Sequence, residues 1–218
     1  MTTPMSRARG RLESASLYLV TPAETQAGPL DEFLPWVLEA GVDVVQLREK
    51  QMEAGPLLGH AEVVRRRTEE FGALFIINDR VDVAGAAGAD GVHLGQNDLP
   101  LEEARRQAGK DFILGLSTHA ESEVIAAGDS EADYIAVGPV FETPTKPGRA
   151  AAGTDLVRFA AQHSKRPFFA IGGIDLSTLS EVIAAGARRV AVVRALTEAD
   201  DPAGVGRLMA SALAQARR

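Results

Sequence analysis

Three side chains that can bind a polyphosphate stand at alternate positions of one short segment. Gln46, Arg48 and Lys50 lie at the end of a predicted strand over 42–47. Alternate residues of an extended chain point to the same side, so an amide, a guanidinium and an ammonium group can meet one ligand. The guanidinium offers a planar fork of donors and the ammonium a compact charge, and both suit phosphate oxygens. The alternative is a solvated strand end in which Arg48 or Lys50 pairs with a nearby carboxylate.

Two carboxylates follow the next two predicted strands. Asp79 comes directly after Asn78 at the end of one strand, and Asp98 lies shortly beyond the other. Such residues in front of a helix often act as N-caps, and Pro100 fits the first turn of the helix that follows. If adjacent strands bring the carboxylates together, they suit Mg²⁺, which takes few protein oxygens and keeps water or phosphate as its other ligands. A magnesium site is therefore one prediction, and capping is the other.

Hydroxyl groups and a lysine follow the fifth and sixth predicted strands. Ser117 can donate to a ligand, although the spacing from Thr118 to Glu121 is that of a helix capping box. The segment over 138–154 is long and irregular, and such loops tend to bind ligands. It carries side chains that can bind anionic oxygens: Thr143, Thr145 and Lys146. The alternative is a proline-stiffened surface loop.

Glycines and a cation end the last two predicted strands. Gly172 and Gly173 allow the backbone to approach a ligand closely, and the N–H groups that follow favour phosphate. Arg194 follows the eighth strand and adds a positive charge at the same place. These features predict a second phosphate site.

The positioning elements are eight short apolar runs, as expected for buried parallel strands. They cover residues 17–20, 42–47, 74–77, 91–94, 112–116, 134–137, 168–171 and 189–193. Amphipathic stretches separate them, for example Leu34, Val37 and Leu38 at helical spacing, and a last helix is predicted around 203–216. Eight such units in one chain predict an α/β fold, a single (β/α)₈ TIM barrel. A doubly wound open sheet is the alternative, but the first strand lacks the glycine-rich turn typical of it.

Composition excludes several function classes. The chain has 218 residues, 45% of them apolar and 24% charged, which is ordinary for a globular domain. It has no cysteine, so thiol nucleophiles, disulfides and thiolate metal sites are excluded. The net charge of −7 argues against a nucleic-acid or membrane partner. Residues 1–16 are polar and predict a disordered tail before a barrel over 17–218.

Six segments in register resemble the thiamine-phosphate synthase family. They begin at Gln46, Ile77, Gly91, Gly115, Gly138 and Ile171, and they read QLREK, INDR, GVHLGQ, GLSTH, GPVFETPTK and IGGI. The resemblance runs from about residue 17 to residue 201. It implies a (β/α)₈ barrel and a cytoplasmic, Mg²⁺-dependent transferase of thiamine biosynthesis, with small phosphorylated substrates and possible homo-oligomers. The implied reaction joins 4-amino-5-hydroxymethyl-2-methylpyrimidine diphosphate to a thiazole phosphate, or to its carboxylate form, and yields thiamine monophosphate and pyrophosphate.

The resemblance also implies residue roles. The pyrimidine diphosphate would be held by Gln46, Arg48, Lys50, Asn78, Ser117 and Lys146, of which Arg48, Lys50, Ser117 and Lys146 would be catalytic. The thiazole phosphate would be held by Thr143, Pro144, Thr145, Gly173, Val193 and Arg194. Asp79 and Asp98 would bind Mg²⁺. Arg194 stands where family members often carry serine, and Asn97 where an acidic residue is common.

The residue types favour direct transfer, because no cysteine and no evident Ser–His–acid set offers a nucleophile. Mg²⁺ and cations would neutralise the departing pyrophosphate while the methylene carbon approaches a carbocation. Three alternatives remain. A thiazole tautomerase would use His119 as proton carrier but would not need the metal and diphosphate residues together. A Schiff-base aldolase needs a lysine on an apolar strand, which 134–137 lacks, and a phosphate-sensing barrel would keep only the glycine site.

Overall fold

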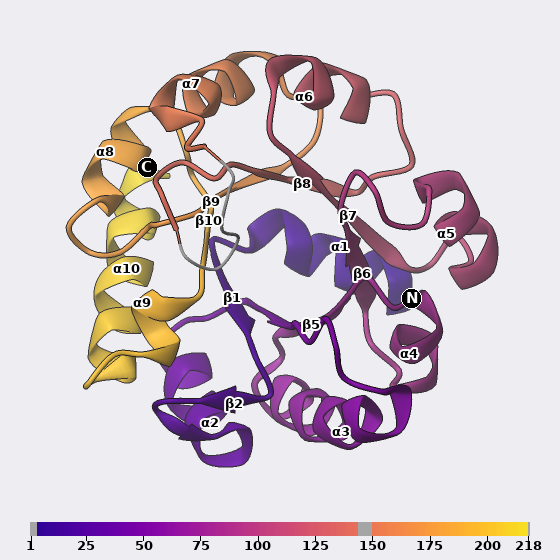
Figure 1. The fold of residues 1–218 in the computed structure, drawn as a ribbon. Coiled ribbons are helices and arrows are strands. Elements are labelled where there is room, and N and C mark those ends of the chain that lie inside the picture. Colours follow the sequence, from indigo (N-terminus) through magenta and orange to yellow (C-terminus); the bar gives the residue numbers. More distant parts are fainter. Residues whose placement is uncertain (1–3, 144–149, 218) are drawn as a thin grey trace.

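Eight parallel strands close into a barrel in the computed structural model, which describes residues 4–143 and 150–217 (Figure 1). The strands are β1 (Leu17–Thr21), β4 (Val44–Leu47), β5 (Leu74–Asn78), β6 (Gly91–Leu94), β7 (Ile113–Thr118), β8 (Tyr134–Val137), β9 (Phe168–Ile171) and β10 (Val190–Val192). Strand β1 pairs with both β4 and β10, and this closes the sheet. All eight apolar runs are therefore strands, and the TIM-barrel prediction is confirmed.

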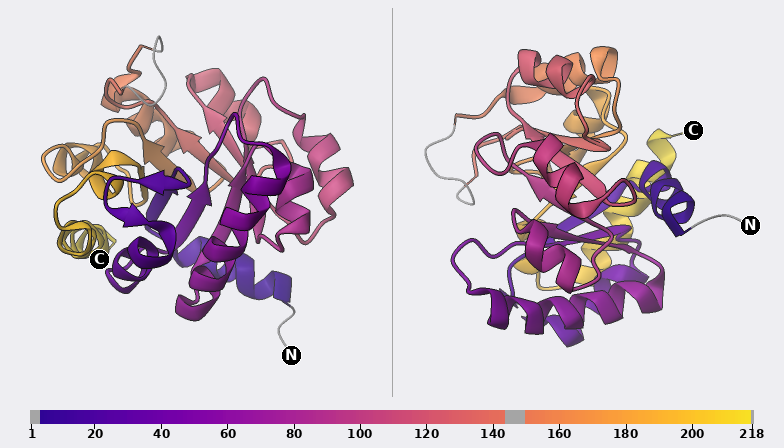
Figure 2. Two further views of the ribbon diagram at one scale, coloured as in Figure 1. Left: turned by 60° about the horizontal axis from the view of Figure 1, so that its bottom comes forward. Right: turned by 90° about the vertical axis from the view of Figure 1, so that its right-hand side faces the viewer.

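Helices surround the barrel on its outside (Figures 1 and 2). They are α2 (Leu30–Glu39), α3 (Ala54–Phe71), α4 (Val81–Ala86), α5 (Leu101–Ala108), α6 (Glu121–Ala127), α7 (Gly153–His163), α8 (Leu179–Ala184), α9 (Arg194–Thr197) and α10 (Pro202–Ala216). Their apolar stripes face the strands, as Phe33, Leu34 and Val37 of α2 do with no exposed surface. A small hairpin of β2 (Glu24–Thr25) and β3 (Gly28–Pro29), which the sequence analysis does not predict, follows β1.

Apolar side chains form two separate cores. The larger one lies between the strands and the helices, and the smaller one fills the barrel interior. Three aromatic residues dominate the interior: Tyr18, Tyr134 and Phe169, with Phe169 edge-on to both tyrosines. Offset and edge-on ring pairs are favourable arrangements of aromatic groups, so the barrel has a packed floor beneath its open end.

Three aspartates repeat one role at the amino ends of the strands. Asp43, Asp90 and Asp133 stand just before β4, β6 and β8, and each accepts a hydrogen bond from a backbone N–H of the preceding barrel strand or its start. Charge-assisted bonds of this kind satisfy backbone groups that would otherwise be left unpaired. The repeat keeps neighbouring strands in register at the end opposite the carboxyl ends.

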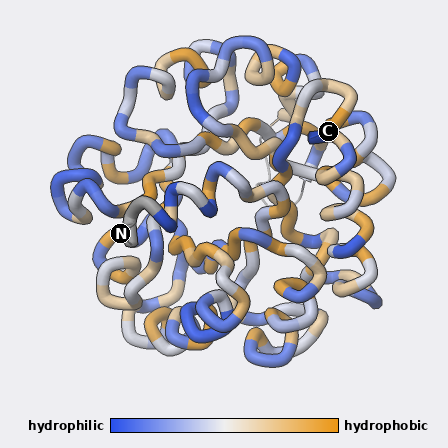
Figure 3. Tube along the Cα trace, turned by 180° about the vertical axis from the view of Figure 1, so that it is seen from behind, coloured by the Kyte–Doolittle hydropathy of each residue, from blue (hydrophilic) through white to orange (hydrophobic). Residues whose placement is uncertain are grey.

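The predicted disordered tail is wrong for residues 4–14, which form helix α1 (Pro4–Ser14) across the amino end of the barrel (Figures 1 and 3). Ala8 and Leu12 are buried and belong to the interior core. Arg11 donates to the carbonyl oxygens of Gly72 and Ala73. The sequence of this segment is mostly polar because only a narrow apolar stripe of the helix contacts the barrel. The helix is stabilised by this contact with the barrel and not by its local sequence.

No helix in residues 4–143 or 150–217 is long and apolar enough to cross a membrane.

Candidate functional site

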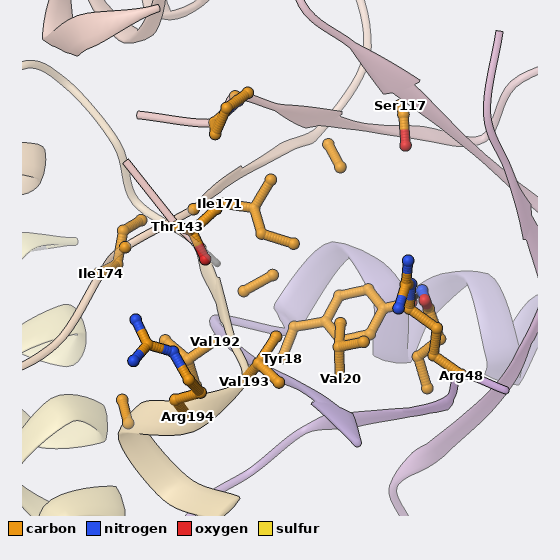
Figure 4. Close-up of a pocket in the computed structure, with 18 of the residues that line it drawn as sticks. Tyr18, Val20, Arg48, Ser117, Thr143, Ile171, Ile174, Val192, Val193 and Arg194 are labelled. Carbon is orange, nitrogen blue, oxygen red and sulfur yellow. Dashed lines mark hydrogen bonds between the residues drawn. The ribbon is translucent and has the colours of Figure 1, made fainter. Parts of the chain in front are cut away.

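A pocket of about 330 Å³ opens at the carboxyl ends of the strands (Figure 4). Its lining contains eight of the predicted site residues: Gln46, Arg48, Asn78, Ser117, Thr143, Gly173, Val193 and Arg194. This is the end of a TIM barrel at which active sites are found. The structure thus brings residues from six different strands, or from the segments that follow them, to one cavity.

Two arginines reach the pocket from opposite sides. Figure 4 shows Arg48 beside Tyr18 on one side, and Arg194 near Val193 and Thr143 on the other, with apolar side chains between them. The Arg194 guanidinium lies 3.9 Å from the Glu198 carboxylate and is 45% exposed, so the ion pair is loose. The arrangement suits a substrate pair that is anionic at both ends and apolar in the middle.

Lys50, Asp79 and Asp98 form a polar cluster beside the Arg48 side of the pocket. The Lys50 Nζ lies 3.2 Å from Asp79 Oδ2, and the Asp79 and Asp98 carboxyl groups are hydrogen-bonded to each other. Burial raises the pKa of Asp79, the Asp98 carboxyl raises it further, and Lys50 lowers it. Two acidic groups in contact therefore resist ionising together. The prediction that adjacent strands bring these carboxylates together is confirmed.

Neither carboxylate caps a helix in residues 4–143, so that alternative is wrong. Helix α4 begins after Arg80 and helix α5 after Pro100, and neither N-terminus there receives a side-chain cap. Asp98 instead accepts a hydrogen bond of 2.7 Å from the N–H of Gly95. Asp79 has a positive φ of 61°, in the left-handed region that aspartate adopts more readily than most other non-glycine residues.

The cluster fits a divalent cation with oxygen ligands. Two carboxylates that share a partly buried position suppress each other's charge, and a cation placed between them removes that conflict. The described residues hold no group of three or more histidine, cysteine or acidic side chains of the kind that forms a closed metal cage. An ion here would take its remaining ligands from water or substrate, which is typical of Mg²⁺.

Asn78 lines the pocket and carries an unpaired, buried donor. Its side chain is buried, and its Nδ2 atom has no hydrogen-bond partner among the described residues. A buried amide donor without a partner is costly unless a ligand supplies an acceptor. Asn78 is therefore suited to an anionic or carbonyl oxygen of a bound molecule.

A chain of buried hydrogen bonds forms the pocket floor. Gln46 Nε2 donates to the Tyr18 hydroxyl at 2.7 Å, and the Tyr18 and Tyr134 hydroxyls are 2.8 Å apart. His93 Nδ1 lies 3.0 Å from the Tyr134 hydroxyl, and His93 Nε2 lies 2.9 Å from Ser117 Oγ. Burial raises the pKa of both tyrosines, so both hydroxyls keep their protons. Tyr18, Tyr134 and His93 are not among the site residues predicted from the sequence, although a polar residue inside a buried strand is itself a signal.

The contact between Ser117 and His93 does not form a Ser–His–acid triad. The second ring nitrogen of His93 faces the hydroxyl of Tyr134, where a triad has a carboxylate. This arrangement agrees with the prediction of a transfer without a covalent intermediate on serine.

The paired glycines of the β9 end serve loop packing. A Cβ at Gly172 would lie 2.6 Å from Pro139, and a Cβ at Gly173 would lie 2.7 Å from Phe141. Both glycines have positive φ values, 104° and 65°. They therefore let the segment after β8 lie against the end of β9, which places Thr143 in the pocket lining. Pro144, Thr145 and Lys146 lie outside the described residues.

His119 lines the pocket but is fixed by the backbone. Its Nδ1 contacts the carbonyl oxygen of Gly138, and its backbone N–H donates to Glu123. Thr118 donates to the carbonyl oxygen of Ala136 and does not form the predicted capping box. The segment thus has a structural role, as predicted, through contacts other than a cap.

Known proteins of one family are similar to this chain in sequence and in fold. A family model described as thiamine monophosphate synthase matches residues 17–196. A thiamine-phosphate synthase from Streptomyces avermitilis is 55% identical over 197 residues, covering 89% of this chain and 92% of that protein. One from Acidothermus cellulolyticus is 51% identical over 210 residues, covering 95% and 99%. The structure of a thiamine phosphate pyrophosphorylase from Pyrococcus furiosus superposes with a TM-score of 0.85 at 32% identity and covers 95% of this chain and 98% of its own. The chain therefore belongs to the thiamine monophosphate synthase family.

Proposed function

We propose that this protein joins 4-amino-5-hydroxymethyl-2-methylpyrimidine diphosphate to a thiazole phosphate and releases thiamine monophosphate and pyrophosphate. When the carboxylate form of the thiazole phosphate is the substrate, its carboxylate leaves as CO₂ as well. The observation that carries the proposal is one apolar pocket with an arginine at each side and a carboxylate pair beside one of them. Family membership and the names of the relatives agree with this reaction. The substrates are small phosphorylated molecules, and we expect the enzyme to work in the cytoplasm.

The pyrimidine diphosphate is proposed to occupy the Arg48 side. Arg48 and Lys50 would neutralise the diphosphate, and the unpaired Nδ2 of Asn78 would donate to one of its oxygens. Gln46 and Ser117, at the two ends of the buried hydrogen-bond chain, would contact the pyrimidine ring. Lys146, from the segment over 144–149, is proposed to add a further cation to the same group.

Asp79 and Asp98 are proposed to hold Mg²⁺. When bound, the ion would supply positive charge to the leaving diphosphate and would hold its oxygens in one orientation. Lys50, whose ammonium contacts Asp79, would then be available to the diphosphate itself.

The thiazole phosphate is proposed to occupy the Arg194 side. Gly173, Val193 and Arg194 line the pocket there with Thr143. Among the described residues the ion-pair partner of Arg194 is Glu198 at 3.9 Å, and this loose pair would let the guanidinium turn to a phosphate and bind it through two donors. Pro144 and Thr145 are proposed to complete this phosphate site from the loop.

The chain's own residues are proposed to act by position and charge. The bond between the pyrimidine methylene carbon and the diphosphate oxygen breaks, its electron pair leaves with pyrophosphate, and the thiazole nitrogen supplies the pair of the new C–N bond. Arg48, Lys50 and Lys146 would stabilise the negative charge that develops on the leaving group. Holding both substrates by their phosphates would supply a large effective molarity for the attack.

The direct test incubates the protein with both substrates and Mg²⁺, oxidises the mixture and measures thiochrome fluorescence. We expect product only when both substrates and the metal are present. Product formation by a variant that carries both Asp79→Ala and Asp98→Ala at the wild-type rate would show that the metal assignment is wrong. Absence of any Mg²⁺-dependent product from the unaltered protein would show that the proposed reaction is wrong.

A further inference from the structure

We infer that the buried chain from Gln46 through Tyr18, Tyr134 and His93 to Ser117 has a fixed direction of hydrogen-bond donation, and that Tyr134 and His93 are positioning residues for the substrate. The chain crosses five strands of the barrel interior and has both ends in the pocket. In this role the hydrogen-bond chain fixes whether each of its ends offers a donor or an acceptor to a ligand. The inference about the ligand rests on the proposed function, whereas the inference about the direction does not.

The direction follows from counting protons. Gln46 Nε2 can only donate, so the Tyr18 hydroxyl accepts from it and directs its own proton to Tyr134. The Tyr134 hydroxyl accepts that proton and directs its own to His93 Nδ1. A neutral imidazole that accepts at Nδ1 carries its proton on Nε2, which then donates to Ser117 Oγ.

Protonated tyrosines are necessary for this direction, and burial provides them. Tyr18 and Tyr134 have little or no exposed surface, and desolvation raises the pKa of each hydroxyl well above its ordinary value. A hydroxyl that cannot ionise must both donate and accept in order to satisfy a buried position. Each tyrosine has one neighbour on either side in the chain, so both needs are met.

The sequence makes room for the central bond. A Cβ at Gly115 on strand β7 would lie 2.4 Å from the Tyr134 hydroxyl oxygen and 2.5 Å from His93 Nδ1. Any side chain at this position would therefore press on the two atoms that form the bond. Gly115 lies within a strand and has an ordinary negative φ, so the space, and not an unusual backbone angle, is what requires a glycine here.

The two ends of the chain then offer complementary groups. Ser117 Oγ accepts from His93, so its hydroxyl proton is available to a ligand in the pocket. Gln46 uses Nε2 inside the chain, so its Oε1 is the acceptor that the amide has left for a ligand. An acceptor and a donor facing one cavity match a heteroaromatic amine, whose amino group donates and whose ring nitrogen accepts.

The test is nitrogen NMR of the ligand-free protein labelled with ¹⁵N-histidine, which reports the tautomer of His93. We expect His93 to carry its proton on Nε2 in the unaltered protein. In Tyr134→Phe, Nδ1 loses its donor, so we expect a mixed or reversed tautomer and a KM for the pyrimidine diphosphate that rises about tenfold, as for the loss of one buried hydrogen bond. The KM for the thiazole phosphate is expected to stay within twofold.

Phe169→Leu is the matched control, because Phe169 packs on both tyrosines without joining the hydrogen-bond chain. This variant disturbs the same packing and is expected to keep the Nε2–H tautomer. A proton on Nδ1 or on both nitrogens of His93 in the unaltered protein would overturn the inference. So would a Tyr134→Phe protein with an unchanged tautomer. The tautomer is read without substrate, so failure of the proposed reaction would leave this result intact and distinguishable.

Discussion

Asp79 is the residue that shows most clearly how the site is built. It has a positive φ, it is partly buried, and its carboxyl group contacts both Asp98 and Lys50. Burial and the Asp98 carboxyl make ionisation of Asp79 unfavourable, and Lys50 offsets only part of this effect. A desolvated pair of carboxyl groups of this kind is typical of functional sites, where a bound cation offsets the cost of their charge.

Asp79→Asn should separate stability from activity. The pKa of Asp79 is raised, so ionisation destabilises the metal-free protein at pH values above the folded pKa, and this effect fades as the pH falls through it. In EDTA at neutral pH we therefore expect Asp79→Asn to melt at an equal or higher temperature than the unaltered protein. Its Mg²⁺-dependent rate should fall by about 100-fold or more. A lower melting temperature with a normal rate would contradict this account of the site.

Arg194 should determine the affinity for one substrate only. In Arg194→Ala the loss of a charge-assisted contact is expected to raise the KM for the thiazole phosphate by about 10- to 100-fold. The KM for the pyrimidine diphosphate should remain unchanged, because Arg48 serves the other side of the pocket. Glu198→Gln is the matched control, because it removes the charge that pairs loosely with the Arg194 guanidinium. In this variant the KM for the thiazole phosphate should fall or stay unchanged. The measurement is steady-state kinetics in which each substrate is varied in turn. Equal changes in the two KM values would show that the assignment of Arg194 to the thiazole phosphate is wrong.

At the scale of elements, the strands could be predicted from the sequence because buried parallel strands are continuous apolar runs. The runs over 91–94, 134–137 and 168–171 match β6, β8 and β9, and the other five differ from the structure by one to two residues at one or both ends. Helix α1 could not be predicted, because Ala8 and Leu12 become a hydrophobic stripe only against a barrel that the local sequence does not contain. The contact between His93 and Tyr134 cannot be predicted for a similar reason: the positions of their strands in the barrel, and not closeness in the sequence, bring them together.

Helix α1 should contribute stability without affecting catalysis. Leu12 is 3% exposed, so Leu12→Ala is expected to lower the free energy of unfolding by about 2–4 kcal/mol. The kcat of the folded protein should be unchanged, because α1 lies at the end of the barrel opposite the pocket. Arg7→Ala, at an exposed position of the same helix, is the control and should change stability by less than about 0.5 kcal/mol. Urea denaturation measures the free energy of unfolding of both variants. Equal values for Leu12→Ala and Arg7→Ala would show that the helix does not stabilise the barrel.

Gly173→Ala should move the loop that carries Thr143. The new Cβ would lie 2.7 Å from Phe141 Cβ and 2.9 Å from the Glu142 carbonyl oxygen, at a φ of 65°. We expect a loss of stability of about 1–3 kcal/mol and a higher KM for the thiazole phosphate. Gly85→Ala, in helix α4 with open space around its Cβ, is the control and should stabilise the protein slightly. Similar behaviour of the two variants would show that the glycine is dispensable.

For the molecule as a whole, the net charge of −7 coexists with a pocket for anions. The cations at the pocket come from the carboxyl ends of strands, whereas many acidic side chains pair with arginines on the outer helices, as Asp31 does with Arg66 and Arg67. The net charge therefore reflects mainly the outer surface, whereas the order of the strands in the barrel determines which charged side chains meet at the pocket. The substrate pair itself was predictable only through the resemblance, because the residue types alone indicate two anions and a metal.

The central claim is that one pocket transfers the pyrimidinylmethyl group directly from diphosphate to the thiazole nitrogen. Phosphorus NMR of a reaction with both substrates and Mg²⁺ tests it most directly, because it resolves every phosphorylated product in one sample. The account predicts that pyrophosphate and thiamine monophosphate appear in equal amounts, and that neither appears when the thiazole phosphate is left out. Release of orthophosphate, or of pyrophosphate without thiamine monophosphate when both substrates are present, would contradict it.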